Sequence, residues 1–138
     1  AAPEPVDIGI LAVQVYLPRR CVQHADLEKS DGVSPGKYTV GLQQQAMGFV
    51  AEDEDVVSMC LTVVDSLLRD YGVDTDRIGR IDVGSESHVD RAKSIRSFLT
   101  RLLNRDGDSS AGRLAGQDVL GACSAGCSAL LNAVQWME

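Results

Sequence analysis

The sequence predicts a layered α/β fold with a mixed or mostly parallel sheet, on the strength of three observations. Apolar, β-branched segments alternate with helical segments in the order strand, helix, strand, helix, strand, helix. Two of the helical segments have their apolar residues on one face, as helices that cover a sheet do. The 138 residues are 44% hydrophobic and 24% charged, a composition typical of a globular protein. We therefore expect one modest domain with a buried core.

The first part of the chain is predicted to contain a strand, a short helix and a loop. Residues 6–17 are apolar and β-branched and end at Pro18, which is typical of a buried strand. The stretch HADLEKSDG, residues 24–32, indicates a short helix that ends at its glycine. Residues 32–41 contain three glycines and one proline, so we expect a shaped surface loop at which a ligand is contacted.

The middle of the chain is predicted to contain a short strand and a long amphipathic helix. Residues 46–50, AMGFV, indicate the strand. Three acidic residues, Asp53, Glu54 and Asp55, precede the helix and place negative charge at the positive end of its dipole. The helix ends at Gly72. Its apolar positions repeat with helical spacing and are Val57, Cys60, Leu61, Val64, Leu67, Leu68 and Tyr71.

The last third is predicted to contain two strands and two helices. A strand is expected at about residues 80–83, followed by a Gly-Ser turn and a helix. The apolar face of this helix carries Ile95, Phe98, Leu99, Leu102 and Leu103. Its other face is basic and carries Arg91, Lys93, Arg96, Arg101 and Arg105. We interpret the basic face as a solvated helix surface, with anion binding as the alternative. A polar loop over 104–117 and a brief strand, VLGA, then lead to Cys123.

The charge of the chain argues against two classes of partner. Its formal net charge is −7 and its isoelectric point is about 4.7, so the long-range field repels nucleic acid and anionic membranes. The longest apolar run, residues 8–17, is about half of the roughly 20 residues needed to span a bilayer. We expect neither nucleic-acid binding nor a membrane span.

The cysteine positions indicate the redox state of the compartment, and the chain ends indicate whether the chain is a fragment. Cysteines lie at 21, 60, 123 and 127, and the chain does not open on a secretory signal, so reduced thiols in an intracellular compartment are expected. The chain begins without methionine and stops inside a helical pattern. We expect it to be a fragment of a longer chain.

The closing stretch GACSAGCSALLNAVQWM, residues 121–137, is a small-residue turn that runs into an apolar helix. The helix is predicted to be buried almost all round. A cysteine at its start, Cys123, would meet unpaired amides and the positive end of the dipole, which lower a thiol pKa and favour a nucleophilic thiolate. The alternative is a small buried apolar residue. A metal site is poorly supported, because Cys123 and Cys127 with His24 and His88 form no recognisable ligand set.

Several stretches together resemble the N-terminal part of the 3-hydroxy-3-methylglutaryl-CoA synthases, a family of the thiolase superfamily. The stretches are DIGILAVQVYLP, LEKSDGVSPGKYTVGL, AMGF, EDVVSMCLTVV, IGRIDVGSES, KSIRSFL and ACSAGCSALLNAVQWME. They cover essentially the whole chain. The resemblance implies a thiolase-like layered fold, N-terminal half only, with residues 1–138 forming the N-terminal part of a condensing-enzyme domain.

The resemblance also implies roles for four residues. Cys123 aligns with the acyl-accepting cysteine of the family, and Glu86 in VGSES aligns with its catalytic glutamate. Ser34 and Pro35 fall where the family contacts its acyl-CoA ligand. Without the resemblance, we would interpret Glu86 as a solvated acid in a turn. The resemblance instead implies that Glu86 is a base with a raised pKa in a dry pocket.

The implied reaction is an acyl transfer that needs no cofactor. Acetyl-CoA would acetylate the cysteine, and the acetyl group would condense with acetoacetyl-CoA to give 3-hydroxy-3-methylglutaryl-CoA. This step belongs to isoprenoid and sterol biosynthesis through mevalonate, or to ketone-body formation. The resemblance further implies small-molecule acyl-CoA partners, a homodimer of the complete protein, and a cytoplasmic location with mitochondria as the alternative.

The chain departs from the family at the nucleophile. The family motif usually reads Asn-Ala-Cys-Tyr-Gly-Gly-Thr, and the differing positions here are Gly121, Ser124, Ala125 and Cys127. Loss of the aromatic ring at 124 is expected to widen and wet the pocket. The histidine, asparagine and lysine contacts of the family lie beyond residue 138, so we expect this chain alone to be inactive. The alternatives are a ketosynthase or polyketide β-branching synthase that uses a carrier protein, and a non-catalytic remnant that binds acyl-CoA or a partner.

Overall fold

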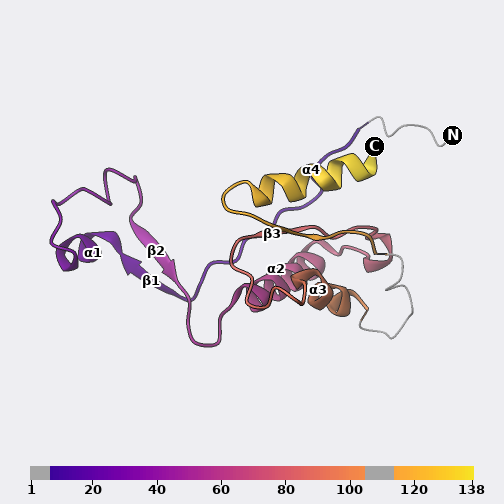
Figure 1. Cartoon of the computed structure of the whole chain (residues 1–138), viewed down its shortest axis with the longest axis horizontal. Coiled ribbons are helices and arrows are strands. Elements are labelled where there is room, and N and C mark those ends of the chain that lie inside the picture. The colour runs from indigo at the N-terminus through magenta and orange to yellow at the C-terminus, as the bar shows by residue number, and fades with distance from the viewer. Residues whose placement is uncertain (1–6, 105–113) are drawn as a thin grey trace. The chain divides into compact units, whose positions relative to one another are not determined.

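The computed structural model describes residues 7–104 and 114–138 (Figure 1). The chain divides into two compact units, one of residues 16–55 and the other of the N-terminal segment together with residues 56–138. The elements are β1 Arg20–Gln23, α1 His24–Ser30, β2 Ala46–Phe49, α2 Val56–Tyr71, the 3-10 helix η1 Thr75–Arg77, β3 Val83–Ser85, α3 Ile95–Leu103, β4 Asp118–Leu120 and α4 Ala125–Met137.

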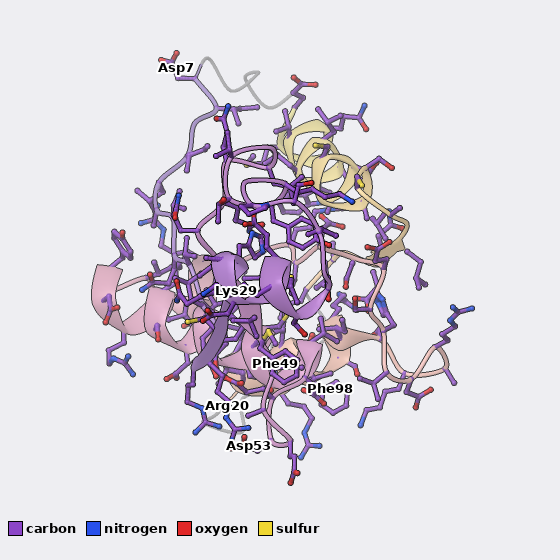
Figure 2. The ribbon with its side chains drawn as sticks, turned by 90° about the vertical axis from the view of Figure 1, so that its left-hand side faces the viewer. Asp7, Arg20, Lys29, Phe49, Asp53 and Phe98 are labelled. Carbon is purple, nitrogen blue, oxygen red and sulfur yellow. The ribbon has the colours of Figure 1, made fainter. Side chains whose placement is uncertain are left out.

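The unit of residues 16–55 is a two-stranded ladder with one helix and a loop. Strands β1 and β2 pair antiparallel, with Arg20 opposite Phe49 at one end of the ladder; both side chains are labelled in Figure 2. Helix α1 starts directly after β1. The predicted helix and the strand at 46–50 are confirmed in this unit. Strand β1 is not predicted by the sequence, because two of its four residues, Arg20 and Gln23, are polar and the strand is short.

The second unit has three layers. Strands β3 and β4 pair in parallel, with Val83 opposite Asp118 and Ser85 opposite Leu120. Helix α4 packs on one side of these strands, while α2 and α3 pack together on the other (Figure 1). The buried centre consists of Val83, Ile95 and Leu99, against which apolar residues of α2 pack. The one-sided apolar patterns of α2 and α3 therefore meet in the core, as the sequence predicts.

A glycine sets how closely α4 approaches the sheet. A Cβ atom at Gly84, in the middle of β3, would lie 2.4 Å from the carbonyl oxygen of Ala125 and 2.6 Å from the amide nitrogen of Gly126. Only a residue without a side chain allows the first turn of α4 to lie this close to the strand. Ala125, which makes that approach, is 2% exposed.

The predicted strand over residues 6–17 is wrong for the part that the structure describes. Residues 7–18 form neither strand nor helix. A strand needs a neighbour that takes its backbone hydrogen bonds, and Val13 and Gln14 of this segment are instead hydrogen-bonded to side chains of α2. The hydroxyl of Tyr71 donates to the carbonyl oxygen of Val13 (3.0 Å), and the amide of Gln14 donates to Asp70 (2.9 Å). Leu11 is 88% exposed.

Three further expectations need correction. The described strands form one antiparallel and one parallel pair rather than a single mixed or mostly parallel sheet. The predicted strand at 80–83 lies later, at β3, and Arg80 forms only an isolated bridge with Ala115. Helix α4 is also not buried all round, because no described element covers the face that carries Leu130 and Leu131, which are 57% and 60% exposed.

The helices also bear on the expected absence of a membrane span. Among the described residues, no helix combines the length and the apolarity that crossing a bilayer requires.

Candidate functional site

Glu86 and Cys123 leave the sheet at the same edge. Glu86 directly follows β3, and Cys123 lies three residues beyond the end of β4. Ser85 pairs with Leu120 at the last position of this parallel ladder, and the amide of Gly121 donates to the carbonyl oxygen of Ser85 (3.4 Å). In parallel strands the carboxyl ends share one edge, which is where α/β folds place their sites. The structure thus brings both residues to one end of the strand pair.

Cys123 lies in the turn that enters α4 and is exposed. Ser124, the residue before the helix, makes no side-chain cap hydrogen bond, so no side chain takes up the first amides of the helix. The turn closes through the amide of Ala125, which donates to the carbonyl oxygen of Ala122 (3.1 Å). The alternative of a buried apolar Cys123 is not what the described residues show, because Cys123 is exposed among them. The four cysteines all lie in the described residues and form no disulfide there.

Glu86 starts the loop of residues 86–94 that joins β3 to α3, and it is exposed. The loop begins with a local turn, in which the amide of Ser87 donates to the hydroxyl oxygen of Ser85 (3.1 Å). A carboxylate that removes a proton from carbon needs a dry environment. The described residues do not enclose Glu86, so such an environment is not formed by them.

A carboxylate at the start of β4 connects this loop to α3. One oxygen of Asp118 accepts from Nε2 of His88 (3.0 Å) and from the amide of Ile95 (2.5 Å), and the other accepts from the amide of Arg96 (3.0 Å). The hydroxyl oxygen of Ser94 caps the same helix end by accepting from the amide of Ser97 (3.2 Å). Asp118 therefore stabilises the positive end of α3 from a neighbouring strand. Sequence reasoning did not find it, because its partners lie 22 to 30 residues away.

The basic side of α3 is only partly the solvated surface that the sequence predicts. Arg91 and Arg101 are exposed, as expected. The Arg96 guanidinium instead donates to the backbone carbonyl oxygens of Leu114 and of Ala115, the latter at 3.3 Å from Nε. The Lys93 ammonium lies 4.0 Å from the centre of the Phe98 ring, a cation–π contact. Arg105 and most of the predicted loop at 104–117 lie outside the described residues.

The loop that contains Ser34 and Pro35 is organised by one buried carboxylate. Glu28, at 5% exposure, accepts hydrogen bonds from the amides of Gly36 (2.9 Å), Tyr38 (2.7 Å) and Thr39 (2.8 Å). These bonds, chiefly that of the Thr39 amide and then that of the Gly36 amide, lower the pKa of Glu28 to about 2. Ser34 and Pro35 are exposed next to this turn. A glutamate in the last turn of a helix before a Gly-Pro loop is the signal that could have found Glu28.

A second buried carboxylate changes the role that the sequence assigns to the acidic run at 53–55. Helix α2 starts at Val56 and has no acidic residue in its first turn. Glu54 instead accepts hydrogen bonds from the Tyr16 hydroxyl and from the amide of Ala51 (2.7 Å). The Tyr16 bond, followed by that of the Ala51 amide, lowers the pKa of Glu54 to about 2. Asp53 forms an ion pair with Arg19 at 2.5 Å.

The side chains that could bind a metal ion lie apart from one another among the described residues. Within residues 7–104 and 114–138, no three His, Cys, Asp or Glu side chains come together as a ligand set. Nδ1 of His24 lies 3.0 Å from the carbonyl oxygen of Gln44, and His88 is bound to Asp118.

Comparison with known proteins identifies the family. The family described as hydroxymethylglutaryl-coenzyme A synthase N terminal matches residues 4–138. This chain belongs to that family. The hydroxymethylglutaryl-CoA synthase of Saccharomyces cerevisiae is 45% identical over 134 residues, which are 97% of this chain and 26% of that protein. The cytoplasmic hydroxymethylglutaryl-CoA synthase of Mus musculus is 44% identical over 97% of this chain and 25% of its own length. The predicted family is confirmed.

A solved structure supports the same assignment for the fold. MvaS in complex with 3-hydroxy-3-methylglutaryl coenzyme A is similar with a TM-score of 0.80 and 34% identity, and the match covers 90% of this chain and 28% of that one. The described residues therefore have the thiolase-like α/β fold of the N-terminal portion of a hydroxymethylglutaryl-CoA synthase. The chain spans between 25% and 28% of the length of these relatives.

Proposed function

We propose that this chain carries the acyl-accepting cysteine and the proton-abstracting glutamate of a hydroxymethylglutaryl-CoA synthase, whose complete protein condenses acetyl-CoA with acetoacetyl-CoA. The observation that carries the proposal is the parallel pairing of β3 with β4, which delivers Glu86 and Cys123 to one edge of the strands. Membership of the family and the exposure of the Cys123 thiol support it. No cofactor takes part.

In the first step the sulfur of Cys123 is the nucleophile. It forms a bond to the thioester carbonyl carbon of acetyl-CoA, the bond from that carbon to the CoA sulfur breaks, and CoA leaves as a thiol after taking up a proton. The negative charge on the carbonyl oxygen needs hydrogen-bond donors at that moment. The first amides of α4, which have no side-chain cap, are suited to donate to it.

In the second step Glu86 takes a proton from the acetyl methyl group on Cys123. The resulting enolate carbon bonds to the ketone carbon of acetoacetyl-CoA, whose oxygen becomes a hydroxyl by taking up a proton. Water then hydrolyses the enzyme thioester, which releases 3-hydroxy-3-methylglutaryl-CoA and regenerates the thiol. The loop held by Glu28 presents Ser34 and Pro35 to the acyl-CoA chain.

The complete protein supplies what the described residues lack. We propose that later sequence covers the exposed apolar face of α4, encloses Glu86 and adds the contacts to acetoacetyl-CoA, so that this chain alone is inactive. The complete protein is a homodimer that acts in the cytoplasm, in a mevalonate-forming route. Ser124, in place of the aromatic residue of the family, leaves a wider and wetter pocket that alters turnover.

Isotope labelling of the complete protein tests the proposal. Incubation with labelled acetyl-CoA, followed by digestion and mass analysis, is expected to place one acetyl group on Cys123. Cys123→Ser abolishes this adduct. Cys127→Ser, one helical turn along and also exposed, is the matched control and retains it. An adduct on Cys127 in place of Cys123 refutes the assignment of the nucleophile. The absence of any adduct supports the non-catalytic remnant, and acylation only from a carrier protein supports a ketosynthase.

A further inference from the structure

His88 is the internal anchor of the loop that carries Glu86. Among residues 86–92 it alone is not exposed, and its side chain is only 2% exposed. Its neighbour Val89 is 71% exposed. The loop also has local hydrogen bonds, such as that from the amide of Ala92 to Asp90 (2.8 Å). These hold short turns together, but they do not tie the loop to another element.

Asp118, the partner of His88, is itself held in place by its position in β4 and by hydrogen bonds from two amides of α3. The Asp118 side chain is 7% exposed and belongs to the first residue of β4, opposite Val83 of β3. It accepts from the first amides of α3 at Ile95 and Arg96, and Ile95 is one of the most deeply buried residues of the core. A loop bonded to Asp118 is therefore bonded to a rigid point of the strand pair.

The position of the imidazole ring determines which nitrogen of His88 donates a hydrogen bond to Asp118. A carboxylate only accepts, so Nε2 of His88 carries the proton that bonds to Asp118 at 3.0 Å. Nδ1 is buried without a hydrogen-bond partner among the described residues. Leaving a buried polar atom unsatisfied costs free energy that a hydrocarbon side chain would avoid. The Nε2 bond is thus what distinguishes histidine from a leucine at this position.

We propose that His88 is a positioning residue: by donating from Nε2 to Asp118 it holds the loop that starts at Glu86 against the strand that leads to Cys123. The Glu86 carboxylate is thereby kept in place to take a proton from an acetyl group on Cys123. This inference rests on the proposed function. It assigns to His88 no contact with substrate, because its side chain is buried between the loop and β4.

The inference separates two steps of the reaction. Acetylation of Cys123 does not involve Glu86, whereas removal of a methyl proton does. A misplacement of about 1 Å in a reacting group costs about a hundredfold in rate. Loss of the tether is therefore expected to slow the second step by about 10- to 100-fold and to leave the first within about twofold.

The experiment uses the complete protein and three variants. His88→Leu removes the donor, His88→Gln keeps an amide N–H that can reach Asp118, and Val89→Ala is the control in the same loop. The first readout is acetylation of Cys123 by labelled acetyl-CoA. The second is exchange of the acetyl methyl protons on Cys123 with D2O, followed by mass analysis. His88→Leu is expected to slow only the exchange, His88→Gln to restore most of it, and Val89→Ala to change neither.

A structural readout is independent of catalysis. Amide hydrogen exchange at Ser87 and Ala92 is expected to be about tenfold faster or more in His88→Leu, with the amides of α3 unchanged. If His88→Leu does not fold, His88→Asn replaces it, because the shorter amide loses the reach to Asp118 while a polar side chain remains. The expected results for His88→Asn are the same.

The outcomes distinguish the two proposals. Equal slowing of both steps, no slowing of either, or loop amide exchange like that of the wild type overturns the role of His88 while leaving Cys123 acetylation in place. If the wild type takes no acetyl group, the proposed function fails, and the positioning role fails with it. In that case faster amide exchange in His88→Leu still identifies a structural tether without a catalytic purpose.

Discussion

Replacement of Gly84 by alanine is expected to displace the helix that follows Cys123. The added Cβ would lie 2.4 Å from the carbonyl oxygen and 2.5 Å from the carbonyl carbon of Ala125. These are backbone atoms, so no side chain can rotate away. Relief to an ordinary contact requires the first turn of α4 to move by about 1 Å away from β3.

The size of the effect follows from the cost of overpacking. Insertion of a methyl group into a packed region costs about 1–3 kcal/mol, and because backbone must move here we expect about 3 kcal/mol. That is a large fraction of the roughly 5–15 kcal/mol by which domains are stable. The same shift moves the turn that holds Cys123, so acetylation of its thiol is expected to slow.

Denaturant unfolding and the rate of Cys123 acetylation, both in the complete protein, measure the two consequences. Gly126→Ala is the matched control, since nothing lies within 4 Å of a Cβ at that helical position. It is expected to stabilise the protein by up to about 1 kcal/mol through helix propensity. A Gly84→Ala variant with the stability and the acetylation rate of the wild type would refute the view that this glycine seats α4.

Two further predictions concern buried polar groups. The pKa values of Glu28 and Glu54 are lowered from 4.5 to about 2 in the folded protein. Between these two pH values the unfolded state binds more protons than the folded state. The free energy of unfolding is therefore expected to fall as the pH drops from about 4.5 to about 2. Urea unfolding over that range should show this slope, and it should be shallower in Glu28→Gln and Glu54→Gln; an unchanged slope in both would contradict the assignment. Arg96→Lys is expected to lower the free energy of unfolding by about 1 kcal/mol, because an ammonium cannot reproduce the guanidinium bonds to two carbonyl oxygens. Thermal unfolding measures this, and the exposed control Arg101→Lys is expected to leave stability unchanged. Equal effects of the two variants would show that the Arg96 bonds contribute nothing.

Sequence reasoning succeeded where a local pattern specifies the structure. The apolar spacing of α2 and α3 predicts both helices, because a helix that packs on a core must repeat its apolar residues every three to four positions. The glycine-rich loop near Ser34 and the turn before Cys123 follow from residue types that favour turns. The family follows from motifs spread along the chain, whereas the roles of Glu86 and Cys123 stay predictions.

Sequence reasoning failed where the deciding contact lies far along the chain. The apolar run that includes Leu11 has the composition of a strand, but a strand exists only where a neighbour accepts its hydrogen bonds, and none of the described residues does so. Strand β1 shows the reverse. Half of its four residues are polar, yet they form a ladder because β2 is available to pair with them.

The sequence by itself determined the family, the two amphipathic helices and the residue types of the candidate chemistry. Only the tertiary structure decided that Glu28 organises its loop, that Asp118 joins β4 to α3 and to His88, and that Gly84 lets α4 approach the sheet. The physical reason is that a hydrogen bond or a steric contact depends on which distant segments meet, whereas periodicity and turn preference are properties of neighbours in the chain.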